Sequence, residues 1–135
     1  MWKVDHFAFE ILDMDRAVRF YTEKLGLKLI ERRLNTEGRD YWGCDEYAIL
    51  ELDGGNLELI RLNGTISRTS DIEPHLKPPY CPHIALITED MDATLRVIEE
   101  RDISIVKGPC KIEGWTRWLY ICDPDGNQIE IVQWL

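Results

Sequence analysis

The stretch DPDGNQIEIVQW, residues 123–134, holds a turn followed by a strand with a carboxylate in its middle. The first part is a turn by composition, because Pro fixes φ, Gly permits positive φ, and Asp and Asn bond to their own backbone. The β-branched and aromatic residues that follow predict a strand. Glu130 stands in the centre of that apolar strand, where an unpaired buried charge is costly. The fold must therefore supply a partner for this carboxylate.

Length and composition place the chain among ordinary globular proteins. Its 135 residues are enough for one domain with a real core, and its 44% hydrophobic and 30% charged content is typical of such domains. No apolar run approaches a membrane span and no signal-peptide layout opens the chain, so we expect a cytoplasmic protein. The net charge of −9 argues against nucleic acid as a partner. The four cysteines form no Cys-x-x-Cys pair, which favours free thiols.

The chain repeats its distinctive residues in the same order. His6 and His83, each in a short apolar strand, are as far apart as the two Asp-Met-Asp tripeptides at 13–15 and 90–92. Each tripeptide opens a helical pattern that its first Asp can cap. The sequence DGGNLELI at 53–60 likewise matches DGNQIEIV at 125–132, which aligns Glu58 with Glu130. We infer that the chain is a duplication.

The repeat predicts the fold class and the domain organisation. Further strand-like runs lie at 27–32 and 47–52 in the first half and at 103–106 and 115–122 in the second. The prediction is an α+β fold of two βαβββ modules, residues 1–62 and 82–135, within a single domain 1–135. A polar, Pro-bearing linker, 63–81, joins them and contains His75, which we interpret as a surface residue.

One His on the first strand and one Glu on the last strand of each module make four candidate metal ligands: His6, Glu58, His83 and Glu130. If the modules pair about a pseudo-twofold axis, the four side chains converge. Two imidazoles and two carboxylates suit a divalent transition metal, with room for water or substrate. A single strand His is usually a core residue, but its recurrence with Glu favours a metal site. The metal charge would then offset the Glu130 carboxylate.

These residues resemble the vicinal oxygen chelate superfamily, which includes glyoxalase I, bleomycin-resistance proteins, fosfomycin-resistance thiol transferases, methylmalonyl-CoA epimerases and extradiol dioxygenases. The resemblance covers nearly the whole chain and rests on His6, RAVRFYTEKLGLKL at 16–29, His83 and the terminal motif. It implies an open, cup-shaped mixed sheet around one divalent metal ion, often in a homodimer.

A Glu at the second ligand position, as with Glu58, makes the chain most similar to the glyoxalase I branch. The resemblance implies a metal-dependent lyase or isomerase of lactoylglutathione lyase type, which acts on a small vicinal-oxygen substrate through a metal-stabilised enediolate. It implies Glu130 as the catalytic base and Glu58 as its counterpart, and either carboxylate can serve. Nickel, cobalt or zinc suits this chemistry, whereas iron suits a dioxygenase and manganese a thiol transferase.

The sequence departs from glyoxalase I at its glutathione-binding positions. Glu10 stands where bacterial glyoxalase I has an Arg, and Leu62 stands in place of an Asn. Glutathione dependence is therefore doubtful, and a dioxygenase, a thiol transferase or a metal-free ligand-sequestering protein are the alternatives.

Arg117, among aromatic residues, is a candidate for binding a substrate carboxylate or phosphate, or else stacks or faces solvent. Tyr41–Trp42 is a candidate for lining the cup.

Overall fold

The computed structural model describes residues 1–38, 43–63 and 77–135, and the chain divides into two compact units, Met1–Asp71 and Ile72–Leu135. Tyr41–Trp42, His75 and most of the expected linker lie outside the described residues. Within the described ranges, no helix is both long enough and apolar enough to cross a membrane.

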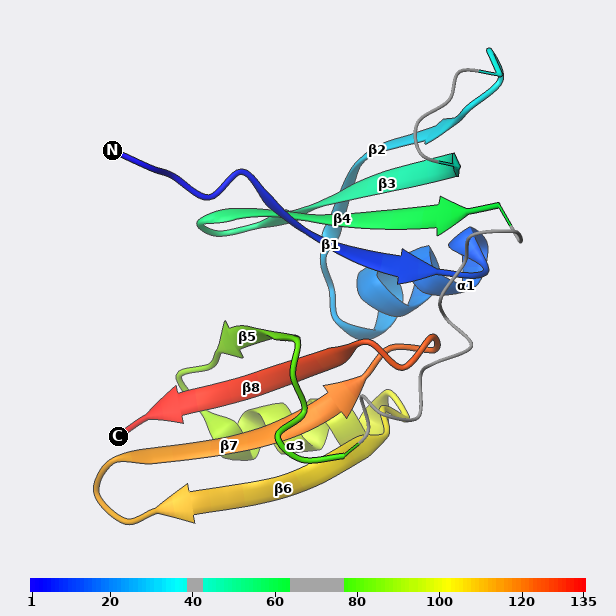
Figure 1. Cartoon of the computed structure of the whole chain (residues 1–135). Coiled ribbons are helices and arrows are strands. Elements are labelled where there is room, and N and C mark those ends of the chain that lie inside the picture. Colours follow the sequence, from blue (N-terminus) through cyan, green and yellow to red (C-terminus); the bar gives the residue numbers. More distant parts are fainter. Residues whose placement is uncertain (39–42, 64–76) are drawn as a thin grey trace. The chain divides into compact units, whose positions relative to one another are not determined.

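The first unit is one four-stranded sheet with a helix. Its elements are β1 (His6–Ile11), α1 (Met14–Arg19), the π-helical turn η1 (Phe20–Lys24), β2 (Lys28–Leu34), β3 (Cys44–Leu52) and β4 (Gly55–Leu62). The strand order is β1-β4-β3-β2. β1 runs parallel to β4, and the other neighbours are antiparallel (Figure 1).

The second unit repeats this topology with new strands. Its elements are β5 (His83–Ile87), α3 (Met91–Glu100), β6 (Ile105–Ile112), β7 (Thr116–Cys122) and β8 (Gln128–Trp134), in the strand order β5-β8-β7-β6. β5 is parallel to β8. The predicted βαβββ repeat and the α+β fold class are therefore confirmed, although β3 and β6 are longer than the sequence pattern indicated.

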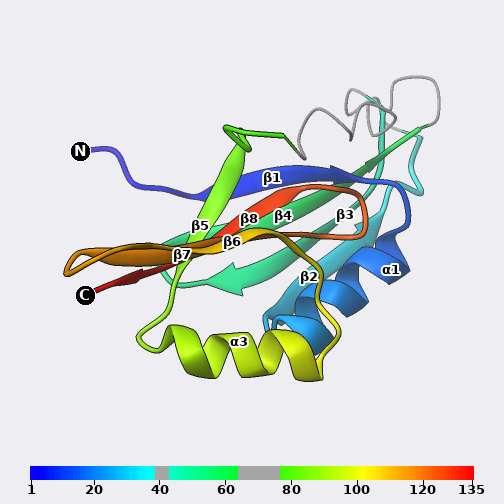
Figure 2. The same cartoon turned by 90° about the horizontal axis from the view of Figure 1, so that it is seen from below.

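Each helix covers one face of its own sheet and forms a core there (Figure 2). In unit 1 the strand residues that alternate onto this face, such as Leu57 and Leu59, are fully buried together with Ala17 of α1. In unit 2 Ile129 and Met91 of α3 are equally buried. Side chains on the opposite face of each sheet follow the same period of two, and the candidate ligands belong to that face.

The predicted helix caps are present in both units. The Asp13 carboxylate accepts from the Arg16 N–H at 3.0 Å, and the Asp90 carboxylate accepts from the Ala93 N–H at 2.9 Å. Each bond satisfies a backbone donor that the first helical turn leaves without a partner. The caps fix where each helix leaves the strand that carries a candidate histidine.

Candidate functional site

The sheet of unit 1 brings His6 and Glu58 together. Ala8 of β1 pairs with Glu58 of β4, and His6 lies two residues before Ala8 on the same face. Across this parallel ladder His6 Nε2 lies 3.3 Å from Glu58 Oε2. Neither residue is deeply buried, because the His6 side chain is 45% exposed and the Glu58 side chain 21%.

Unit 2 builds the same pair at the same register. Ala85 of β5 pairs with Glu130 of β8, and His83 lies two residues before Ala85. His83 Nε2 lies 3.0 Å from Glu130 Oε2. The repeat found in the sequence is therefore a repeat of geometry: a His and a Glu on adjacent parallel strands, with Nε2 facing the carboxylate.

The far nitrogen of each imidazole is held by an acceptor. His6 Nδ1 lies 2.7 Å from Asp5 Oδ2, and His83 Nδ1 lies 3.0 Å from the backbone oxygen of Tyr80. The ionised carboxylate of Asp5 and the backbone oxygen of Tyr80 can only accept hydrogen bonds. Nδ1 therefore carries the proton in both rings. In a neutral imidazole Nε2 then presents a lone pair to a carboxylate, and the two need a second proton or a cation between them.

The spacing within each pair fits two ligands of one metal ion. Imidazole nitrogen and carboxylate oxygen bind zinc-like metals at about 2.0–2.2 Å, which places two neighbouring ligands about 2.8–3.6 Å apart in octahedral or tetrahedral geometry. The observed separations of 3.3 and 3.0 Å lie in that interval. An imidazolium–carboxylate hydrogen bond has similar dimensions, so the spacing suits a proton and a metal alike.

Local charges act on His6. The Asp5 hydrogen bond raises the pKa of His6, while burial of the ring opposes this rise and the nearby Glu58 charge adds to it. The raised pKa means that the imidazolium form of His6 persists to a higher pH than that of an ordinary histidine. The same Asp5 contact makes the ring a more basic ligand through Nε2.

An aromatic cluster encloses the pair of unit 2. The Tyr120 ring lies edge-on to His83 at 5.4 Å and contacts the ring of Tyr80 at 4.8 Å between centroids. Tyr120 is also the cross-strand partner of Glu130. Burial, followed by the negative charge of Glu130, raises the pKa of Tyr120, so its hydroxyl stays protonated beside the carboxylate.

The turn before β8 fixes the start of the strand that carries Glu130. Asp123 Oδ1 accepts from the backbone N–H groups of Asp125 and Asn127, both at 2.9 Å, and Oδ2 accepts from the Asn127 side chain at 2.8 Å. Asp123 is buried, so these bonds replace the water it has lost. The turn at 123–127 is therefore a hydrogen-bonded support for the start of β8.

Within residues 1–38, 43–63 and 77–135, no group of three or more His, Cys, Asp or Glu side chains lies close enough together to hold a metal ion. Each unit supplies two donors. Two donors leave most of the coordination sphere of a transition metal open, so neither pair is a complete protein site by itself.

Residues 3–131 match the model of the Glyoxalase/Bleomycin resistance protein/Dioxygenase superfamily. The chain belongs to this superfamily. A probable lactoylglutathione lyase of Vibrio cholerae is 28% identical over 132 residues, which cover 97% of the chain and 90% of that protein. The superfamily contains many enzymes, and its members commonly bind a divalent metal, which agrees with the imidazole and carboxylate donors of the two pairs.

Solved structures share the fold of this chain. A glyoxalase family protein from Bacillus cereus has a TM-score of 0.73 at 24% identity, covering 100% of this chain and 95% of that one. TnmS3, an antibiotic-binding protein from Streptomyces sp. CB03234, has a TM-score of 0.72 at 22% identity, covering 100% and 98%. At these identities the structures establish the fold alone, and the activity is argued from the residues.

Arg117, a candidate for substrate binding in the sequence, forms an ion pair within unit 2. Its Nη2 donates to Asp92 Oδ1 of α3 at 2.7 Å, and this hydrogen bond holds the pKa of Asp92 below its usual range. Arg117 is an odd number of residues from Tyr120 on β7, so it projects from the sheet face opposite to Glu130. It ties the sheet to its helix, and we leave it out of the proposed function.

Two groups that hold the imidazole rings were not predicted from the sequence. Asp5 holds His6 and is its immediate neighbour in the chain, so an acidic residue next to a candidate ligand was an available signal. Tyr80 holds His83 through its backbone oxygen, and a carbonyl leaves no mark in a sequence.

Proposed function

We propose that this chain is a metal-dependent enzyme of glyoxalase I type, a lyase or isomerase for a small substrate with oxygens on adjacent carbons. The observation that carries the proposal is the repeated pair, in which Nε2 of His6 and of His83 faces a carboxylate oxygen at 3.3 and 3.0 Å. Similarity to probable lactoylglutathione lyases supports this reaction class.

The proposed centre uses both pairs together. His6, Glu58, His83 and Glu130 supply two nitrogens and two oxygens for one divalent ion, with nickel, cobalt or zinc as the metals that suit this set. Neither pair is a complete site alone, and a duplicated module provides the missing half. A bound dication supplies positive charge that stabilises negative charge developing on the adjacent oxygens of the substrate.

The protein residues then perform the proton transfer. We assign Glu130 as the base that takes a proton from the carbon beside the substrate carbonyl and returns it to the neighbouring carbon, with no net oxidation. Glu58 is its counterpart in the first module. Asp5 and the Tyr80 carbonyl hold the imidazoles in place, and the Tyr120 hydroxyl remains a neutral donor on the same face of the sheet as Glu130.

The first experiment is elemental analysis of the purified protein, combined with reconstitution by Ni²⁺, Co²⁺ or Zn²⁺. Turnover is measured on the methylglyoxal–glutathione hemithioacetal and, without glutathione, as solvent-deuterium exchange into hydroxyacetone and dihydroxyacetone by NMR. Turnover is also measured for Glu130→Gln and Glu58→Gln, and Glu113→Gln is their matched control, since the Glu113 side chain is 86% exposed.

One bound metal with turnover supports the proposal. A bound metal with no turnover or exchange on any of these substrates would retain the metal centre and remove the lyase assignment. Failure to bind metal under every reconstitution would move the protein to the ligand-sequestering class.

A further inference from the structure

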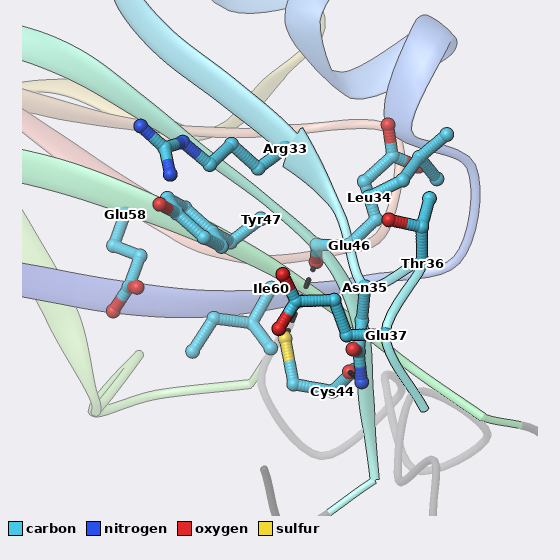
Figure 3. A pocket seen from close by; sticks show the side chains of 10 residues that line it. All are labelled: Arg33, Leu34, Asn35, Thr36, Glu37, Cys44, Glu46, Tyr47, Glu58 and Ile60. Carbon is cyan, nitrogen blue, oxygen red and sulfur yellow. Dashed lines mark hydrogen bonds between the residues drawn. The ribbon is translucent and has the colours of Figure 1, made fainter. Parts of the chain in front are cut away.

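A pocket of about 650 Å³ lies within unit 1 and reaches Glu58. Its walls come from β2, β3, β4 and the residues that follow β2 (Figure 3). Tyr47 pairs with Ile60 across β3 and β4, and Ile60 pairs with Glu10 of β1, so these side chains share the sheet face of His6 and Glu58. A volume of this size is within the range of small-molecule sites.

The Tyr47 ring and the Ile60 side chain give the pocket two apolar surfaces near Glu58, and Arg33 lies at the same end (Figure 3). Figure 3 shows Tyr47 and Ile60 side by side, with Glu58 toward one end of the pocket and Cys44 beyond Ile60. Burial raises the pKa of the Cys44 thiol, which donates to the Glu46 backbone oxygen at 3.5 Å, so Cys44 is a neutral wall. A flat ring inserted here contacts the Tyr47 ring and the Ile60 side chain.

Arg33, a cationic residue in the pocket wall, already forms an ion pair. Arg33 lies directly across from Tyr47 in the β2–β3 ladder, and its Nε forms an ion pair with Glu31 on the same strand. A second anion placed at Arg33 would have to compete with this carboxylate. Arg33 would therefore contribute little to the binding of an anionic ligand.

The other charged residues of the wall are acidic. Glu46 and Glu58 line the pocket together with Glu37. The Glu46 carboxylate is already paired, since Arg32 Nε lies at 2.6 Å and Arg61 Nε at 3.3 Å. Across the β1–β4 ladder, Glu10 adds a further carboxylate beside Ile60. With Glu46 paired and the Glu58 charge offset by a bound metal, an entering carboxylate or phosphate would still meet like charge from Glu37 and Glu10.

We propose that this pocket receives the tail of the substrate and selects a neutral, flat apolar group over a tail that carries carboxylate or phosphate. The inference rests on the proposed function, because the pocket adjoins Glu58 and so extends from the vicinal oxygens of a bound substrate. It defines the substrate class as an aromatic or aliphatic vicinal-oxygen compound in place of an anionic conjugate such as a glutathione adduct.

The first test uses three chelators on the metal-loaded protein: acetohydroxamate, benzohydroxamate and 4-carboxybenzohydroxamate. All three present the same pair of adjacent oxygens. Burial of the ring is expected to make benzohydroxamate bind at least about tenfold more tightly than acetohydroxamate, and the carboxylate is expected to remove that gain. Tyr47→Ala should abolish the advantage of the ring, measured as the ratio of the affinities for benzohydroxamate and acetohydroxamate.

The second test needs no metal. N-phenyl-1-naphthylamine and its 8-sulfonate have the same rings and differ by one negative charge, and their fluorescence reports binding. The neutral dye should bind and lose affinity in Tyr47→Ala, whereas Trp115→Ala, at a tryptophan 57% exposed in unit 2, should leave it unchanged. Glu10→Arg should increase the affinity of the sulfonate dye selectively.

These tests separate the two proposals. Absence of metal binding would overturn the proposed function, and the dye pair would still decide the preference of the pocket. Tighter binding of 4-carboxybenzohydroxamate than of benzohydroxamate, or of the sulfonate dye than of the neutral dye, would overturn the inference. So would neutral-dye binding that Tyr47→Ala does not weaken.

Discussion

The most informative perturbation is removal of each histidine in turn. If one metal ion is held by both modules, His6→Ala and His83→Ala each remove one of four ligands. Four-ligand zinc sites bind with about 10–16 kcal/mol, so an equal share per ligand is about 2.5–4 kcal/mol. Each variant should therefore bind metal roughly 60- to 700-fold more weakly, and the two losses should be similar.

Competition with a chromogenic chelator gives the metal affinity, and elemental analysis gives the number of ions per chain. The matched control is His75→Ala, at the third histidine of the sequence, which has no counterpart in the repeat. It should bind one ion with the affinity of the parent.

The competing model is two independent two-donor sites. It predicts two weakly held ions in the parent, and each histidine variant would lose one ion while the other stayed unaffected. Such stoichiometry would refute the shared centre even if the protein bound metal well. Parental affinity in both variants would show that neither imidazole is a ligand.

Four further outcomes are expected. Glu130→Gln should retain metal within about tenfold but lower turnover by about 10²–10⁴-fold, the usual contribution of a general base, and a smaller loss than in Glu58→Gln would reverse their roles. Asp123→Ala should lower the free energy of unfolding in urea by about 2–3 kcal/mol, because buried donors of the turn lose their acceptor; an unchanged value would show that the turn does not depend on it. Asp90→Ala should cost about 1 kcal/mol through loss of the α3 cap, and no change in the urea midpoint would contradict this. Without metal, His6→Ala should lower the melting temperature most below about pH 6, since Asp5 raises the folded pKa above the unfolded value of about 6.5. That difference should fade as the pH rises through the folded pKa, and a difference that grows with pH would contradict the assignment.

The sequence was sufficient for the modules and for placing one candidate His and one candidate Glu on the first and last strand of each. Alternation along a strand and the recurrence of His and Glu depend on local spacing, which a sequence displays directly. The register that sets Ala8 opposite Glu58 and Ala85 opposite Glu130 then follows from the shared topology.

The pocket and the position of Arg117 required the structure. Arg33, Tyr47 and Ile60 come from three strands, and only the strand order shows that they are neighbours. Arg117 was placed near the site because aromatic residues surround it in the chain. Its face of the sheet depends on the β7–β8 register, which composition does not reveal.

The two histidines are held by unequal means, although the modules are copies. Asp5 is a side chain, so one substitution can change the basicity of His6 or release the ring altogether. The acceptor for His83 belongs to the backbone of Tyr80, and a side-chain replacement there leaves the carbonyl oxygen in place. A point mutation at position 5 can thus retune the first module, whereas no side-chain replacement removes the Tyr80 carbonyl from His83.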